Sequence, residues 1–303
     1  MKYIDLGGLG KINASAIALG CMRISGKEKK DVESLISAAL ECGINFFDHA
    51  DIYGGGKSEE IFGEAFHGKR DEVMIQSKCG IRKGFFDFSK EHIVSSVEGS
   101  LKRLKTDYLD VLLLHRPDAL MEPEEVAEAF CELEKSGKVR FFGVSNQNPS
   151  QIALLQKYIP QKIIANQLQF SLAHTGMIDC GLTVNMKHEN SVNRDGGVLD
   201  YCRLHDITIQ AWSPVMFGFF GGVFIGSPKY PELNKTLDLI ASEKGVSPSA
   251  VAVAWIMRHP AKIQTIIGTT TPFRVRDYAT AADITLSREE WYALYKAAGN
   301  ILP

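Results

Sequence analysis

Residues 109–117 read Leu-Asp-Val-Leu-Leu-Leu-His-Arg-Pro, a short apolar run that ends at a histidine. A run of this length and composition is typical of a strand buried on both faces of a parallel sheet. Seven similar runs occur along the chain. Together they predict eight strands, at 16–19, 44–47, 73–75, 109–114, 139–144, 163–165, 207–211 and 263–267.

Segments with helical spacing of apolar residues separate these runs. They predict helices at 31–41, 59–66, 91–104, 124–136, 150–158, 198–205, 233–243, 249–258 and 272–282. Strict alternation of strands and helices implies a parallel sheet with right-handed crossovers. Eight such strands close into a barrel, and barrels of about this size commonly form one domain. The predicted fold is therefore an α/β, (β/α)8 TIM barrel spanning residues 1–303 as a single domain.

Four segments stand outside this alternation. Residues 3–15 predict an N-terminal β-hairpin, placed to close the bottom of the barrel. Residues 287–298 predict an extra C-terminal helix, because Ser287 and Glu290 have capping-box spacing. The segments 171–196 and 213–231 follow strands, so we expect both to overhang the carboxyl ends of the strands.

Composition and charge narrow the class of protein. Lys and Arg number 34 against 36 Asp and Glu, so no nucleic-acid or anionic membrane partner is indicated, and no protein partner is evident. Neither a signal peptide nor an apolar run long enough to span a membrane is found, which predicts a cytoplasmic protein. The six cysteines form no C-x-x-C pair, so we expect reduced thiols and no metal site.

Polar residues follow almost every predicted strand. A barrel places its chemistry at the carboxyl ends of its strands, so these residues are expected to meet at one rim. They are Asp48 with Tyr53, then Lys78, His115, Ser145-Asn146, Asn166-Gln167, Trp212-Ser213 and Gly268-Thr269-Thr270-Thr271. Any one of them alone would be read as an ordinary strand end that meets solvent.

Four of these residues suggest proton delivery. A tyrosine with its usual pKa near 10 becomes a useful acid only where its phenolate is stabilised, and a lysine ammonium can do that. Asp48 can provide the counter-charge that Lys78 needs, and His115 can position a carbonyl oxygen. Taken singly, His115 would be a core histidine and Tyr53 a loop aromatic.

The motifs Asp48-His49-Ala50-Asp51-Ile52-Tyr53, Lys78 and Leu-Leu-His115-Arg116-Pro117 resemble those of the aldo-keto reductase superfamily. The segments 143–146, 166–167, 212–214 and 268–274 extend the resemblance over essentially the whole chain. It implies NAD(P)H-dependent reduction of small aldehydes or ketones, with Asp48, Tyr53, Lys78 and His115 as the catalytic residues. The resemblance also implies cofactor contacts by Gly20, Cys21, Met22, Ser145, Asn146, Gln167, Trp212, Ser213, Pro214, Gly268, Thr269, Thr270 and Arg274.

We expect a substrate pocket that includes Met22, Phe86 and Arg116. Its edges at Met22, Tyr53, Phe86 and the segment 217–220 would make it mostly apolar. His49 stands where the family often has threonine, and we expect its larger ring to reshape this pocket. Thr271 and Pro272 predict a helix start with free amides that attract phosphate, and Arg274 lies in its first turn. NADPH is therefore the expected cofactor. NADH remains an alternative, because Gly268 stands where many NADPH-preferring members carry lysine.

Four other functions have to be distinguished from carbonyl reduction. The run 54–58 resembles the end of a P-loop, but its first glycine is missing and it follows the wrong strand. A metal-dependent hydrolase is disfavoured, because Lys78 and Tyr53 would stand beside the cation. The open alternatives are a cofactor-binding regulatory subunit with little turnover and an aldolase that uses Lys78 as a Schiff base.

Overall fold

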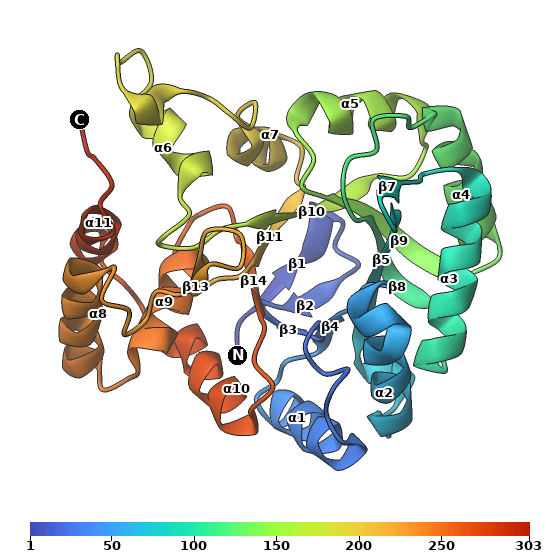
Figure 1. The fold of residues 1–303 in the computed structure, drawn as a ribbon, viewed down its shortest axis with the longest axis horizontal. Coiled ribbons are helices and arrows are strands. Elements are labelled where there is room, and N and C mark those ends of the chain that lie inside the picture. The colour runs from blue at the N-terminus through green and yellow to red at the C-terminus, as the bar shows by residue number, and fades with distance from the viewer.

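The computed structural model describes residues 1–303 and contains a closed barrel of eight parallel strands ringed by helices (Figure 1). The strands are β3 (Ile17–Gly20), β4 (Phe46–Asp48), β5 (Met74–Cys79), β8 (Leu109–Leu114), β9 (Val139–Ser145), β10 (Ile163–Gln169), β11 (Thr208–Trp212) and β14 (Gln264–Ile267). The barrel closes where Thr265 of β14 pairs with Ile17 of β3. All eight predicted strands are present, so the predicted TIM barrel is confirmed.

Two strands extend four residues beyond the apolar runs that predicted them. β5 continues through Lys78 to Cys79, and β10 continues through Gln167 to Gln169. Both extensions carry polar side chains into the barrel. An apolar run marks only the part of a strand that has an apolar environment on both faces, so it ends before the strand does.

The predicted outer helices are also present. They are α1 (Lys29–Glu41), α2 (Lys57–Ala65), α3 (Lys90–Leu104), α4 (Pro123–Lys135), α5 (Pro149–Tyr158), α7 (Val198–Leu204), α8 (Pro231–Lys244), α9 (Pro248–Met257) and α10 (Pro272–Ala279). The helix predicted to reach residue 282 ends earlier, because the chain tightens into a 3₁₀ turn at Thr280–Asp283. The Thr280 hydroxyl donates to the carbonyl of Asp277 there, which satisfies one of the last helical carbonyls.

The N-terminal hairpin closes the barrel bottom. β1 (Tyr3–Asp5) pairs antiparallel with β2 (Asn13–Ser15), and in Figure 1 both lie at the centre of the ring of strands. Leu6 and Ile12 are buried and pack against residues such as Phe46 inside the barrel. The predicted hairpin therefore supplies the apolar floor of the interior.

The two predicted overhangs contain structure that the sequence did not reveal. Residues 171–196 include α6 (Gly176–Leu182) and a 3₁₀ turn at Glu189–Ser191. Residues 213–231 include an antiparallel ribbon of β12 (Met216–Phe217) and β13 (Gly222–Val223). A second ribbon, β6 (Ile81–Arg82) with β7 (Phe85–Phe86), follows β5. Two-residue strands carry too little periodicity to be recognised from sequence.

The C-terminal helix α11 (Arg288–Ala297) begins with the predicted capping box, in which Ser287 and Glu290 bond reciprocally. It is joined to α9 by a pair of tryptophans. The indole nitrogen of Trp255 donates to the carbonyl of Trp291, and Trp291 returns the same bond, each at 3.0 Å. No helix of the protein combines the length and apolarity needed to cross a membrane.

Candidate active site

Three strand ends and one turn bring the four predicted catalytic side chains together. Asp48 ends β4, Lys78 lies in β5, His115 follows β8, and Tyr53 begins a 3₁₀ turn before α2. The Lys78 Nζ lies 2.8 Å from the Asp48 carboxylate, 2.7 Å from the His49 carbonyl oxygen and 3.1 Å from the Tyr53 Oη. All three ammonium protons are thereby used, and Lys78 is completely buried.

These contacts set the protonation states. Burial raises the pKa of Tyr53 above its ordinary value of 10.0, although the Lys78 charge opposes the shift. Burial lowers the pKa of Lys78, but Asp48 and Tyr53 outweigh it and the net pKa is raised. Tyr53 therefore carries its proton at neutral pH beside a charged ammonium. The Lys78 charge offsets only part of the rise in the Tyr53 pKa that burial causes, whereas the sequence suggested that Lys78 would make Tyr53 a stronger acid.

His115 borders Tyr53 edge-on, with 6.0 Å between the ring centroids. Burial, the Lys78 charge and the Arg116 charge together hold its pKa well below the ordinary value of 6.5. The ring is therefore neutral near pH ~7. Its Nδ1 is buried without a hydrogen-bond partner. No cluster of three or more potential ligands for a metal ion occurs in the protein.

A chain of four glutamines supports Asp48 from below, and only one of them, Gln167, was expected at the site from the sequence. Gln76 and Gln167 donate to Asp48 Oδ1 at 2.6 and 2.9 Å. Gln76 and Gln210 exchange two hydrogen bonds at 3.0 Å, and Gln210 donates to Gln264 at 2.8 Å. These residues bury amides inside the barrel and fix the carboxylate orientation. An isolated glutamine within an otherwise apolar strand was the signal that could have revealed them.

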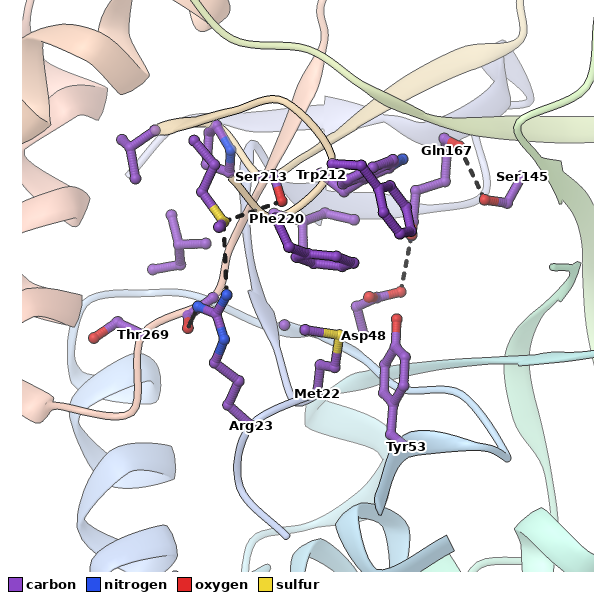
Figure 2. Close-up of a pocket in the computed structure, with 18 of the residues that line it drawn as sticks. Met22, Arg23, Asp48, Tyr53, Ser145, Gln167, Trp212, Ser213, Phe220 and Thr269 are labelled. Carbon is purple, nitrogen blue, oxygen red and sulfur yellow. Dashed lines mark hydrogen bonds between the residues drawn. The ribbon is translucent and has the colours of Figure 1, made fainter. Parts of the chain in front are cut away.

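A cavity of about 500 Å³ opens above these residues. It is lined by most of the predicted site: Gly20, Met22, Asp48, Tyr53, His115, Arg116, Ser145, Asn146, Gln167, Trp212, Ser213, Pro214, Gly268, Thr269 and Arg274. Figure 2 shows Phe220 and Trp212 on one side of this space and Met22 and Tyr53 on the other. The structure thus brings together side chains that lie far apart in the sequence.

Four predicted site residues do not line the cavity. Lys78 and Cys21 are buried beneath its surface, Thr270 lies outside it, and Phe86 is 43 % exposed on the β6–β7 ribbon. Ile81 of this ribbon lines the cavity, whereas both residues of β7, Phe85 and Phe86, are exposed to solvent. Phe86 therefore does not line this cavity, and its predicted role in the substrate pocket stays a prediction.

His49 also differs from its expected position. Its ring is completely buried and packs on Phe62, with 4.5 Å between centroids, and it does not line the cavity. Neither ring nitrogen has a hydrogen-bond partner, and burial, with the Lys78 charge, lowers the pKa of His49 to about 3. His49 follows Asp48 directly, so its side chain points outward between β4 and α2 instead of reshaping the pocket.

A polar and aromatic wall forms the cavity face opposite Tyr53. The Trp212 indole donates to Asn146 Oδ1 at 3.3 Å, and the Asn146 amide donates to Ser145 Oγ at 2.7 Å. Ser145 Oγ in turn donates to the Gln167 carbonyl at 3.0 Å. Asn146 takes a positive φ of 57°, a conformation that asparagine tolerates better than most residues. The wall offers an indole beside amide groups, which suits a flat ring that carries an amide substituent.

A cationic corner lies at the far end of the cavity. Helix α10 begins at Pro272, its N-cap Thr271 makes no side-chain cap, and Arg274 lines the cavity in the first turn. Arg23 was not predicted. Its guanidinium donates to the Gly268 carbonyl at 3.3 Å and to Met216 Sδ at 3.6 Å. Figure 2 shows Arg23 on the side of Thr269, across the cavity from Tyr53.

Gly268 lies directly beside the Arg23 guanidinium. A Cβ atom at position 268 would lie 3.6 Å from Arg23 Nη1. No ion pair joins Arg23 or Arg274 to an acidic side chain. The corner therefore holds two arginines and a free helix N-terminus, an arrangement that favours phosphate. A basic residue three positions after β3 was the only sequence signal for Arg23.

A closed (β/α)8 barrel with a buried lysine and aspartate beside a tyrosine and a histidine at its carboxyl rim defines a class of barrel oxidoreductases. The chain belongs to the Aldo/keto reductase family, whose sequence profile matches residues 16–298.

Similar proteins agree with this assignment. The chain is 37 % identical to the uncharacterized oxidoreductase YcsN of Bacillus subtilis (strain 168), over 93 % of this chain and 94 % of that protein. It is 36 % identical to a 6-dehydroglucose reductase of Agrobacterium fabrum, over 95 % of each chain. It also superimposes on an aldo-keto reductase from Klebsiella pneumoniae crystallised with NADPH. That match has a TM-score of 0.80 and 25 % identity, and it covers 99 % of this chain and 96 % of the other.

Proposed function

We propose that this protein reduces an aldehyde or ketone to an alcohol, with NADPH as hydride donor and Tyr53 as general acid. The observation that carries the proposal is the Lys78 ammonium, which bonds Asp48 and Tyr53 at once beneath the cavity. Burial keeps the phenol protonated at rest, and the ammonium places a positive charge where a phenolate would form.

The residues present fit a nicotinamide dinucleotide. The indole of Trp212 and the amide of Asn146 suit the nicotinamide ring and its carboxamide, and the arginine corner suits the phosphates. When bound, the cofactor would supply hydride to the carbonyl carbon. Arg23 and Arg274 favour NADPH over NADH, because a 2′-phosphate adds nearly two negative charges. The NADPH complex of the Klebsiella relative supports the same assignment.

The protein's own part of the reaction is proton delivery. The His115 ring lines the cavity next to Tyr53 and can donate to a carbonyl oxygen. Tyr53 then gives its proton to that oxygen as the carbonyl is reduced. The phenolate that remains is stabilised by Lys78 at 3.1 Å, whose charge is balanced by Asp48.

The buried ammonium argues against the aldolase alternative. A Schiff-base lysine must be neutral and must reach the substrate. Lys78 has a raised pKa, three hydrogen-bond acceptors and no contact with the cavity. Borohydride treatment in the presence of a carbonyl compound should therefore leave Lys78 unmodified.

The decisive experiment replaces Tyr53 with Phe. Only the proton donor is lost, so NADPH binding should persist while turnover falls by roughly 10²- to 10⁴-fold. Turnover is followed by loss of NADPH absorbance with a panel of aldehydes, and binding by NADPH fluorescence. Tyr158→Phe is a matched control, because Tyr158 lies exposed on α5.

Two outcomes would overturn the assignment. Near wild-type turnover by Tyr53→Phe would show that another group supplies the proton. NADPH binding by the wild-type protein without turnover of any carbonyl compound would instead identify a regulatory subunit.

A further inference from the structure

Arg116 is a half-buried cation without a counter-charge. Its guanidinium lies 5.9 Å from the Trp212 ring centroid and 5.8 Å from that of Phe219. It makes no hydrogen bond and no ion pair with any other residue of the protein. Burial, the main influence, lowers its pKa from the ordinary arginine value, although the group remains charged.

A second cavity, of about 550 Å³, begins at this residue. Arg116, Asn146, Trp212 and Phe219 line both cavities, so the two spaces adjoin at the guanidinium. The second cavity runs under the segment 171–196, and most of its lining is polar. The substrate space therefore extends beyond the mostly apolar pocket expected from the sequence.

The acidic groups of the second cavity are held by other partners. Asp179 accepts a hydrogen bond from the Tyr295 hydroxyl at 2.6 Å, and Asp195 accepts one from the Gly197 amide at 2.9 Å. The other arginine of the lining, Arg194, is paired with Glu189. Arg116 is thus the one charged group of this lining without a protein partner, and it is adjacent in sequence to His115.

An unpaired, partly desolvated guanidinium is costly, and a carboxylate relieves that cost through two parallel hydrogen bonds. The nearby rings of Trp212 and Phe219 hold the guanidinium in place, which keeps its N–H groups oriented for two parallel hydrogen bonds to one carboxylate. A neutral aldehyde would leave the charge unsatisfied.

We propose that the substrate is an oxo acid, with its carbonyl at Tyr53 and His115 and its carboxylate on Arg116. This inference rests on the proposed function and narrows it to one class of substrate. The bulk of a larger substrate would extend into the second cavity, past the guanidinium.

The test compares 4-carboxybenzaldehyde with its methyl ester, which differ chiefly in charge. The wild-type enzyme should show a kcat/KM at least about tenfold higher for the acid, the size of one charge-assisted contact. In Arg116→Gln the ratio of acid to ester should fall to near one, mainly through the KM of the acid. Arg116→Lys should retain part of the preference, since it keeps the charge without the fork.

A matched control is Arg203→Gln, since Arg203 is exposed on α7 and lines neither cavity. Its acid-to-ester ratio should equal that of the wild type. Equal kcat/KM for acid and ester in the wild-type enzyme, or an unchanged ratio in Arg116→Gln, would overturn the oxo-acid inference while leaving carbonyl reduction intact.

Loss of both activities in the wild type would instead contradict the proposed function. Calorimetric titration of the NADPH-loaded protein with benzoate and with benzamide then decides the inference independently of turnover. Benzoate should bind more tightly, and Arg116→Gln should abolish the difference. Equal binding of the two ligands by the wild-type protein would overturn the inference.

Discussion

At the scale of single residues, the environment of a side chain decides its charge. His49 is completely buried and His115 partly buried, and burial is the main cause of the lowered pKa of each. Only His115 lines the cavity, while His49 packs against Phe62. Burial therefore keeps His115 neutral where it can contact a substrate, whereas at His49 it affects only the stability of the fold.

The His49 environment predicts a specific dependence of stability on pH. Its pKa of about 3 in the folded protein lies below the ordinary value of 6.5. The unfolded chain therefore binds the extra proton first, and stability falls as pH decreases through this window. The loss assigned to His49 is about 2 kcal/mol between pH ~7 and pH ~5.

Replacing His49 with Leu tests this dependence by urea unfolding at both pH values. The variant should lose about 2 kcal/mol less than the wild type on acidification, because a leucine cannot bind the proton. His205→Leu is the control, since His205 is exposed on the surface after α7. Equal losses of stability in the wild type and His49→Leu would show that His49 does not cause this pH dependence.

The two arginines of the cationic corner, Arg23 and Arg274, predict how substitutions there change the affinity for NADPH. Arg274→Ala should weaken NADPH by about 2 kcal/mol, close to 30-fold, and leave NADH almost unchanged. From sequence alone, a lysine at position 268 is expected to strengthen NADPH binding. The structure predicts instead that Gly268→Lys gives little gain, because the added ammonium would lie beside the Arg23 guanidinium, which already supplies positive charge here and repels a second cation.

The double variant Gly268→Lys with Arg23→Ala should then bind NADPH more tightly than Arg23→Ala alone. Titration by cofactor fluorescence measures the affinity of the wild type and of the four variants for NADPH and NADH. If Arg274→Ala weakens NADH and NADPH equally, the 2′-phosphate lies elsewhere; if Gly268→Lys alone strengthens NADPH binding, Arg23 does not occupy the corner in solution.

At the scale of elements, the segment 213–231 joins two sides of the cavity. The β12–β13 ribbon brings Met216 against Arg23 of the β3 loop, and Ser171 Oγ donates to the Met216 carbonyl at 2.8 Å. Gly222 takes a φ of 134°, and a Cβ there would meet the Phe217 ring at 3.0 Å. A glycine is thus required for the ribbon to close.

We expect cofactor release to limit turnover, because the segment 213–231 borders the cavity and is expected to open before the oxidised cofactor leaves. Rapid mixing with a good substrate should show a burst of NADPH oxidation followed by a slower steady rate. Gly222→Ala should shrink the burst and weaken NADPH binding by loosening the ribbon. A linear trace without a burst in the wild type would exclude release as the slow step.

At the scale of the whole molecule, strand closure links distant parts of the chain. Each of the eight strands has two neighbours in the barrel, and one buried cluster of 65 residues extends from Ile17 to Tyr295. Because no edge strand is left to separate first, we propose that the chain folds as one cooperative domain.

Equilibrium urea unfolding tests this proposal. Far-UV circular dichroism reports the helices and strands, while tryptophan fluorescence reports Trp212 at the cavity and Trp255 and Trp291 between α9 and α11. The two transitions should share one midpoint. Fluorescence changes that precede the loss of circular dichroism would indicate that part of the molecule unfolds independently.

Much of this protein follows from local patterns in its sequence. The eight strands, their helices and the meeting of Asp48, Tyr53, Lys78 and His115 were predictable, because periodicity is a local property and a barrel gathers its strand ends at one rim. The functional interpretation of those four residues also drew on a family resemblance, which supplied roles that spacing alone does not specify.

The side-chain environments required the tertiary structure. Successive residues of a strand face opposite sides, so His49 faces the helix layer although Asp48 faces the cavity. Phe86 is exposed because its two-stranded ribbon leaves both residues of β7 open to solvent. Arg23 meets Gly268 across 245 residues of chain, and Arg116 is identified as unpaired only when every neighbour is known. Such contacts depend on the distance between remote segments, which no local pattern of residues encodes.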